Sequence, residues 1–244
     1  MIRGAIFDLD GVVLDSMGVW RDLGARYLAR LGAKPEEGLA DKLFSMSMEQ
    51  GAAYLKERYN LAGSVAEIVG GIGRLVEDFY FHEVRAKPGV GRLMEVFAQA
   101  GVQMVAATSS PREHVRRALE RNGLLGYLSA IYTTGEVGKS KHSPDIFDLA
   151  ARGMGWLGFA PGEVVVFEDS LYALETAKAA GYWTVGVFDA DGERDQEGMR
   201  RTADVYLARA EFAEFAERFG SGTLPWAAGD NVPARRGEPN GEER

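Results

Sequence analysis

The chain has 244 residues and a formal net charge of -8, which argues against a nucleic-acid backbone or an anionic membrane surface as its main partner. It contains no cysteine, so disulfides and thiolate metal sites are excluded. Charged residues interrupt the apolar runs well before the length of a membrane span, and an aspartate comes too early for a signal peptide. We therefore expect a cytoplasmic protein.

Short apolar runs that alternate with helical patterns predict an α/β fold. Near-continuous apolar runs are typical of strands covered on both faces, as in a parallel sheet. Strand and helix in alternation with short links indicate a doubly wound, Rossmann-like parallel sheet. The expected strands are residues 4–9, 102–108, 130–134, 163–169, 183–189 and 203–208.

Helix-start signals lie between several of these strands. Residues 88–99 carry an apolar stripe at helical spacing, and Gly101 can end that helix. Ser110 begins the sequence Ser-Pro-Arg-Glu, which predicts a capping box with proline at the first helical position, and the helix should end near Gly123. Ser143 and Pro144 are expected to begin another helix in the same way, and Ser170 to begin one that Gly181 ends.

The segment after the first strand does not follow this alternation of strand and helix. It holds several helical stripes and no convincing strand, and Ser64 with Glu67 forms a second predicted capping box. We interpret residues 16–87 as a helical-bundle cap inserted into an α/β core of residues 1–15 and 88–220. An insertion at the carboxyl end of a strand lies where α/β proteins bind ligands, so this cap is expected to act as a lid. Residues 221–244 are rich in glycine, proline and charge, and we expect a flexible tail.

Several polar residues follow the predicted strands. In a parallel sheet the carboxyl ends of the strands share one edge, so these residues should converge there. Grouped carboxylates repel one another unless a cation relieves them, and an oxygen-only ligand set suits Mg²⁺. Lys141 lies in a loop just before a helix and can balance an anionic substrate. The converging residues are Asp8 and Asp10, Thr108 and Ser109, and Glu168 and Asp169.

These residues resemble the four motifs of the haloacid dehalogenase superfamily, in its phosphatase branch with a helical cap similar to that of β-phosphoglucomutase-like phosphatases. "DLDGVVLDS" resembles the first motif, Thr108 in "VAATSS" the second, Lys141 in "KHSPD" the third and "VVFEDS" the fourth. The resemblance covers about residues 1–208 in the right order. His142 stands where relatives often have proline, and Lys139 is an alternative to Lys141.

The resemblance implies a role for each motif residue. Asp8 would be the nucleophile that forms an aspartyl-phosphate. Asp10 would protonate the leaving oxygen and then activate water. Thr108 and Lys141 would bind the phosphoryl group, with backbone N–H groups of Leu9 and Ser109 completing the cradle. The Mg²⁺ ligands would be Asp8, the main-chain carbonyl of Asp10, and Asp169, with Glu168 in support directly or through water.

The expected activity is Mg²⁺-dependent hydrolysis of a small phosphorylated metabolite such as a sugar phosphate, by a monomer or weak homodimer without nucleic-acid or membrane partners. Cap residues Trp20, Phe44 and Met46 are expected to contact the leaving group.

Three features of the sequence distinguish phosphate hydrolysis from rival functions. A sugar-phosphate mutase of the β-phosphoglucomutase type would carry a histidine where this chain has "DSMGVW" with Trp20, which favours hydrolysis. A haloalkanoate dehalogenase or a phosphonate hydrolase of the superfamily would lack the second aspartate, Asp10. A receiver-like signalling domain, which is not an enzyme, would lack the helical insertion.

Overall fold

The computed structural model describes residues 1–43, 46–155, 158–208 and 211–228. The chain divides into two compact units, one formed by Met1–Asp15 with Arg85–Arg244 and the other by Ser16–Val84. No helix among the described residues combines the length and the apolar character that crossing a membrane requires.

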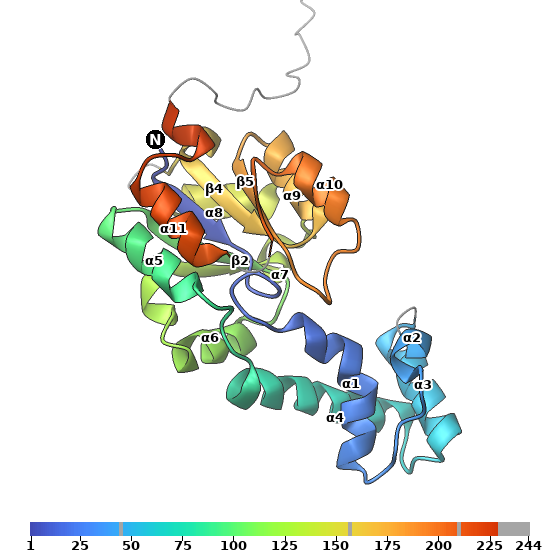
Figure 1. The fold of residues 1–244 in the computed structure, drawn as a ribbon. Helices are drawn as coiled ribbons and strands as arrows, with labels where there is room; N and C mark the ends of the chain where they lie inside the picture. Colours follow the sequence, from blue (N-terminus) through green and yellow to red (C-terminus); the bar gives the residue numbers. More distant parts are fainter. Residues whose placement is uncertain (44–45, 156–157, 209–210, 229–244) are drawn as a thin grey trace, which may run out of the picture. The chain divides into compact units, whose positions relative to one another are not determined.

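The first unit contains a six-stranded parallel sheet in the order β3-β2-β1-β4-β5-β6 (Figure 1). This confirms the predicted α/β fold class. All six predicted strands form, each shorter than predicted by one or two residues at one or both ends. The strands are β1 (Gly4–Phe7), β2 (Gln103–Thr108), β3 (Ala130–Thr133), β4 (Val164–Glu168), β5 (Trp183–Val187) and β6 (Val205–Leu207).

Helices cover both faces of this sheet (Figure 1). Three of them, α7, α10 and α11, are absent from the sequence-based prediction. The helices are α5 (Val90–Gln99), α6 (Arg112–Arg121), α7 (Thr134–Val137), α8 (Asp145–Arg152), α9 (Leu171–Ala179), α10 (Gln196–Thr202) and α11 (Phe212–Gly220). Short 3₁₀ helices lie at Leu125–Tyr127, Pro161–Glu163 and Pro225–Ala228.

The central strand β1 places consecutive side chains in two different cores, because side chains alternate across a strand. Ile6 belongs to a buried cluster with residues of α8 and α9. Phe7 packs on the other face, where its ring stacks on Phe167 of β4 at a centroid distance of 4.5 Å. Phe97 of α5 and Phe215 of α11 surround this ring pair. Both faces are thus apolar, which accounts for the near-continuous apolar run in the sequence.

The expected boundary of the tail at residue 221 is wrong. Leu224 and Trp226 are buried. The Trp226 ring lies 5.7 Å from that of Trp183 and 6.0 Å from that of Phe215, measured between centroids. Apolar contacts therefore hold the chain against the sheet unit at least as far as Trp226. Residues 229–244 lie outside the described part of the chain.

The capping box predicted at Ser110 is also wrong. Helix α6 begins at Arg112 with Pro111 in the N-cap position, and no side chain caps it. The Ser110 hydroxyl instead donates to Asp10, as described below. Helix α8 likewise begins after Pro144 without a side-chain cap. Helix α9 begins after Ser170 as predicted, but the Ser170 oxygen does not accept from a helix N–H, and its hydroxyl donates to Glu168.

The second unit is helical, with α1 (Met17–Arg30), α2 (Leu39–Leu43), α3 (Met48–Tyr59), α4 (Val65–Asp78) and a π-helix at Phe79–Glu83. The predicted capping box of Ser64 and Glu67 at the start of α4 is confirmed. A loop carboxylate, Glu36, joins α2 to α3. It accepts hydrogen bonds from Lys42 (2.8 Å), Tyr54 (2.6 Å) and Arg58 (2.9 Å).

The second unit ends at Val84, three residues before the expected boundary. Lys87 belongs to the sheet unit because its backbone N–H donates to the Val13 carbonyl at 2.8 Å. Its side chain is buried against Asp189.

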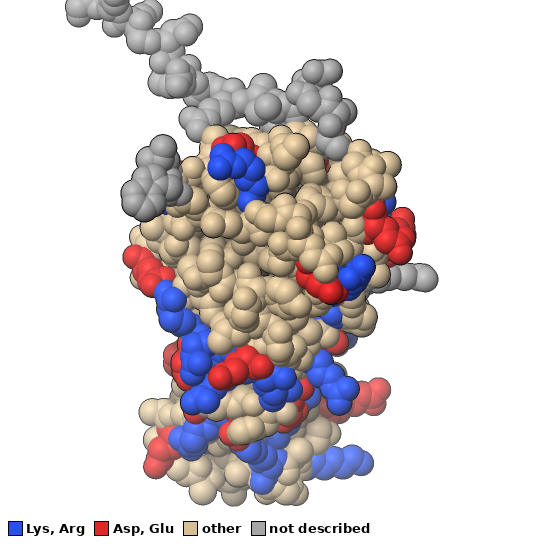
Figure 2. All heavy atoms as spheres, turned by 90° about the vertical axis from the view of Figure 1, so that its left-hand side faces the viewer, with Lys and Arg blue, Asp and Glu red and all other residues tan. Residues whose placement is uncertain are grey.

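Charged side chains are mixed in sign on the face drawn in Figure 2, and a large part of that face carries none. A continuous basic surface, which binding to a nucleic-acid backbone would favour, is not seen there.

Candidate active site

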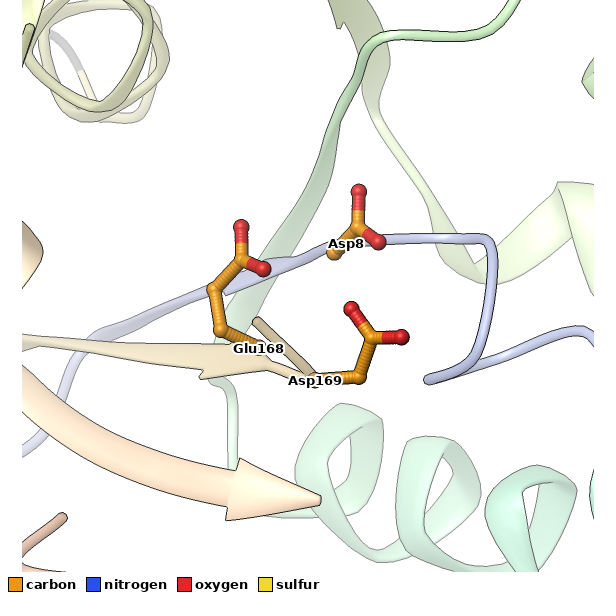
Figure 3. Close-up of side chains that lie close together, drawn as sticks. All are labelled: Asp8, Glu168 and Asp169. Carbon is orange, nitrogen blue, oxygen red and sulfur yellow. The ribbon is translucent and has the colours of Figure 1, made fainter. Parts of the chain in front are cut away.

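Three buried carboxylates meet at the carboxyl ends of two neighbouring strands. Asp8 follows β1, Glu168 is the last residue of β4, and Asp169 follows it. One oxygen of each lies within 4.8 Å of the others. Figure 3 shows the three carboxyl groups turned toward a shared space. The parallel pairing of β1 with β4, with Phe7 opposite Phe167, brings together residues that are 160 positions apart in the sequence.

Lys141 supplies a positive charge to this group. Its Nζ contacts Asp8 Oδ1 and lies 2.7 Å from Glu168 Oε1. The Lys141 side chain is 4 % exposed. The alternative lysine, Lys139, instead pairs with Asp145 at the surface, 2.8 Å away. The structure thus brings Lys141, and not Lys139, to the carboxylates.

Burial and like charge shift the pKa values of these groups. Burial raises the pKa of Asp8 to about 7, against the Lys141 ammonium and with help from the charges of Glu168 and Asp10. Burial and then the charges of Asp8 and Glu168 raise the pKa of Asp169 well above its usual range. Burial alone would lower the pKa of Lys141, but Asp8 and Glu168 outweigh it and hold the pKa above its ordinary value. Lys141 therefore stays charged.

The donor set fits a hard divalent cation. Among the described residues, three buried carboxylates lie together, and Lys141 supplies one positive charge to them. If all three are ionised, the buried group carries an excess of negative charge. A divalent ion bound by carboxylate oxygens would offset that excess and restore the ionised forms. Asp8, Glu168 and Asp169 can offer such oxygens. The Asp10 carboxyl is not part of this group, so only its main-chain carbonyl remains as the ligand expected from the sequence.

The other expected phosphate-binding residues lie at the ends of β1 and β2, which are neighbours in the sheet. Thr108 is buried, and its Oγ1 accepts a hydrogen bond from the Ser110 backbone N–H at 3.0 Å. Ser109 is exposed and Leu9 is buried. Ser110 donates from Oγ to Asp10 Oδ2 at 2.6 Å.

Sequence reasoning missed a second buried pair beside this site. Lys87 Nζ lies 2.7 Å from Asp189 Oδ2 and also donates to the Phe188 carbonyl at 3.0 Å. Asp189 is the second residue after β5, and a Cβ added to Gly192 in the same loop would lie 3.2 Å from Asp169 Oδ2. The loop thus packs closely on a site carboxylate. A lysine directly before Pro88 and an aspartate after an apolar strand were the only sequence signals.

The expected cap residues lie in the other unit. Trp20 is in α1 and is 42 % exposed, and Met46 is half-buried. Phe44 lies outside the described residues. In the sheet unit, exposed His142 stacks on Tyr172 with ring centroids 4.2 Å apart.

Comparisons with known proteins agree with this geometry. Residues 2–181 match the family model described as haloacid dehalogenase-like hydrolase. Hexitol phosphatase A of Escherichia coli is 30% identical over 188 residues, which cover 76% of this chain and 82% of the relative. Phosphorylated carbohydrates phosphatase of Thermotoga maritima is 26% identical over 180 residues, 74% of this chain and 82% of the relative. A solved Thermotoga maritima structure, described as a candidate β-phosphoglucomutase, has a TM-score of 0.78 at 23% identity and covers 89% of this chain and 99% of that one.

Proposed function

The chain belongs to the haloacid dehalogenase-like hydrolases, and we propose that within this family it hydrolyses a phosphate monoester of a small metabolite, with Asp8 as the nucleophile. The observation that carries the proposal is the environment of Asp8. This carboxylate is buried, contacts the buried ammonium of Lys141, and shares a space with Glu168 and Asp169. A nucleophile held in this way is oriented and kept away from bulk water.

The reaction would proceed in two steps. In the first, an Asp8 oxygen attacks phosphorus in line, the bond from phosphorus to the leaving oxygen breaks, and Asp10 gives that oxygen a proton. In the second, Asp10 takes a proton from water as the water attacks the aspartyl-phosphate, which releases phosphate and restores the Asp8 carboxylate. Lys141 and Thr108 would hold phosphoryl oxygens through both steps.

Mg²⁺ is the proposed cofactor, held by Asp8, Asp169 and the Asp10 carbonyl with Glu168 in support. When bound, it would shield the negative charges that approach one another and stabilise charge in the transition state. The carboxylate set, which includes neither histidine nor cysteine, supports this choice over zinc.

A phosphorylated sugar or sugar alcohol is the proposed substrate class. The relatives named as phosphatases of hexitols and of phosphorylated carbohydrates support it. We assign the choice of leaving group to the helical unit, and Trp20 and Met46 are our candidates there. This assignment comes from the family resemblance.

The test is hydrolysis of p-nitrophenyl phosphate and of a panel of sugar and polyol phosphates with Mg²⁺ added. We expect turnover that disappears with excess EDTA and returns when Mg²⁺ is restored, and no turnover by Asp8→Asn. Full activity in EDTA would exclude the metal assignment, and an active Asp8→Asn protein would exclude the nucleophile.

A further inference from the structure

The Ser110 hydroxyl donates a hydrogen bond to the carboxyl group of Asp10. The two residues are 100 positions apart in the sequence, yet Ser110 Oγ lies 2.6 Å from Asp10 Oδ2. Ser110 comes two residues after the end of β2 and Asp10 three residues after the end of β1. Because β1 and β2 are parallel neighbours, both residues lie at the same edge of the sheet.

The backbone around Ser110 is fixed from two sides. Its N–H donates to Thr108 Oγ1 at 3.0 Å, and Thr108 is fully buried. On the other side Pro111 locks its own φ and restricts the residue before it. A short segment with a restricted backbone therefore holds the Ser110 hydroxyl next to Asp10.

Ser110 makes this contact and does not cap the helix that follows. A serine at this place in the sequence would ordinarily cap the helix that follows, which contributes on the order of 1 kcal/mol. Helix α6 has no side-chain cap here. The helix therefore lacks that local stabilisation, and the Ser110 hydroxyl donates to Asp10, which is the acid of the proposed mechanism.

We propose that Ser110 is a positioning residue that holds Asp10 Oδ2, so that proton transfer occurs only at Oδ1. The inference rests on the proposed function, in which Asp10 is first an acid and then a base. A carbonyl or carboxylate oxygen accepts a hydrogen bond in either protonation state. The Ser110 hydroxyl can thus donate to Oδ2 throughout the cycle.

The protons balance on that assignment. The proton on Oδ1 goes to the leaving oxygen as the bond from phosphorus to that oxygen breaks, and Ser110 continues to donate to the resulting carboxylate. Oδ1 then takes a proton from the attacking water. Asp10 is then protonated at Oδ1 again, and its carboxyl group need not rotate before the next cycle. A carboxyl group that rotates freely could instead carry the proton on either oxygen.

The first experiment compares Ser110→Ala with wild type on two kinds of ester. In an enzyme with a covalent intermediate, kcat/KM reports the steps up to formation of that intermediate. A p-nitrophenolate leaves without a proton, whereas an alkoxide needs one. We expect kcat/KM to fall by about 10- to 100-fold for the best alkyl phosphate of the panel, the range expected for a hydrogen bond to a charged group. For p-nitrophenyl phosphate it should fall by less than about threefold, since that leaving group needs little acid.

Ser110→Thr and Ser110→Val form the matched pair, because they have nearly the same shape and only threonine keeps the hydroxyl. We expect threonine to restore the alkyl-ester activity and valine not to do so. This pair also covers the case in which Ser110→Ala folds poorly. Ser129→Ala is the control, since that hydroxyl donates to the Met104 carbonyl in the same unit, and it should leave both esters unchanged.

A double-mutant cycle with Asp10→Asn completes the test. If Ser110 acts through Asp10, replacing Ser110 should have little further effect once Asp10 can no longer exchange a proton. Equal losses for both esters, a valine variant as active as threonine, or fully additive effects would each overturn the positioning role and leave the proposed function standing. A wild-type protein that hydrolyses neither ester would overturn both.

Discussion

Lys87 Nζ lies 2.7 Å from Asp189 Oδ2, and each side chain is only 6 % exposed. The pair joins the segment where the chain returns from the helical unit to the loop after β5, which packs on Asp169. Its two charges are removed from water together. Removing one of them leaves the other buried without a partner, which is far more costly than an exposed ion pair is worth.

We therefore predict that Lys87→Met lowers the free energy of unfolding by about 3–5 kcal/mol, the cost typical of breaking a buried pair. Urea unfolding followed by tryptophan fluorescence measures this, because Trp183 and Trp226 lie in the same unit. The double variant Lys87→Met with Asp189→Asn should be more stable than Lys87→Met alone, since no unpaired charge remains. Equal stability of the single and double variants would contradict this account.

A second prediction concerns Asp10. Asp10→Asn keeps the size of the side chain and the main-chain carbonyl but removes the exchangeable proton. We expect turnover to fall by about 10²- to 10⁴-fold, the usual contribution of general acid–base catalysis. Rapid acid quenching should trap more aspartyl-phosphate than in wild type, because water is no longer activated. Exposed Asp15 provides the matched control Asp15→Asn, and near-normal turnover by Asp10→Asn would remove Asp10 from the mechanism.

A third prediction separates phosphate binding from selection of the leaving group. Lys141→Ala should weaken every ester alike, because in the proposed function Lys141 holds the phosphoryl group whatever that group is attached to. Trp20→Ala should reorder preference among esters and leave activity on p-nitrophenyl phosphate within about tenfold. The measurement is kcat/KM across the panel.

Exposed Lys139, which pairs with Asp145, gives the control Lys139→Ala, which should match wild type. These separate roles would be contradicted if Trp20→Ala lowered kcat/KM equally for all esters while Lys141→Ala changed only the order of preference among them.

A fourth prediction concerns acid. In the helical unit, hydrogen bonds from Lys42, then Tyr54 and Arg58, lower the pKa of Glu36 from 4.5 to about 2. A lowered folded-state pKa means that the folded state binds the proton less readily than the unfolded state. The stabilisation from Glu36 is thus fully present above about pH 4.5 and is lost as the pH falls toward 2.

Glu36→Gln should therefore be less stable than wild type at pH 7, and the difference should shrink toward pH 2. Urea midpoints of both proteins at several pH values test this. Comparing the two proteins at each pH cancels the titration of every other group. A difference that stays constant over the whole range would show that Glu36 does not act through its charge.

The fold could be predicted largely because its strands are buried on both faces. The run that contains Ile6 and Phe7 is apolar throughout since each residue enters a different core. Helix α11 was missed although Phe212, Phe215 and Phe219 recur at helical spacing, because the run is short and the polar tail follows it directly. Trp226 was assigned to that tail, since composition does not reveal a contact with Trp183.

The residues of the candidate site were predictable because the ends of parallel strands converge, which needs no knowledge of side-chain geometry. Asp8, Glu168 and Asp169 do meet there, and Lys141 joins them. Ser110 shows where such reasoning stops. Its sequence context satisfies the rule for a helix cap, and only the three-dimensional neighbourhood of Asp10 decides that the hydroxyl goes elsewhere.

The central position of β1 has a consequence for biosynthesis. This strand is synthesised before both of its neighbours, because it pairs with β2 through Ala106 and with β4 through Phe167. At roughly 5–20 residues per second, its second neighbour is made on the order of 10–30 s later. During that interval one edge of this apolar strand lacks its partner, and a nascent chain that stops before Val164 also lacks Glu168 and Asp169. We therefore expect chaperones to bind chains that end before β4, and we expect such truncated chains to aggregate.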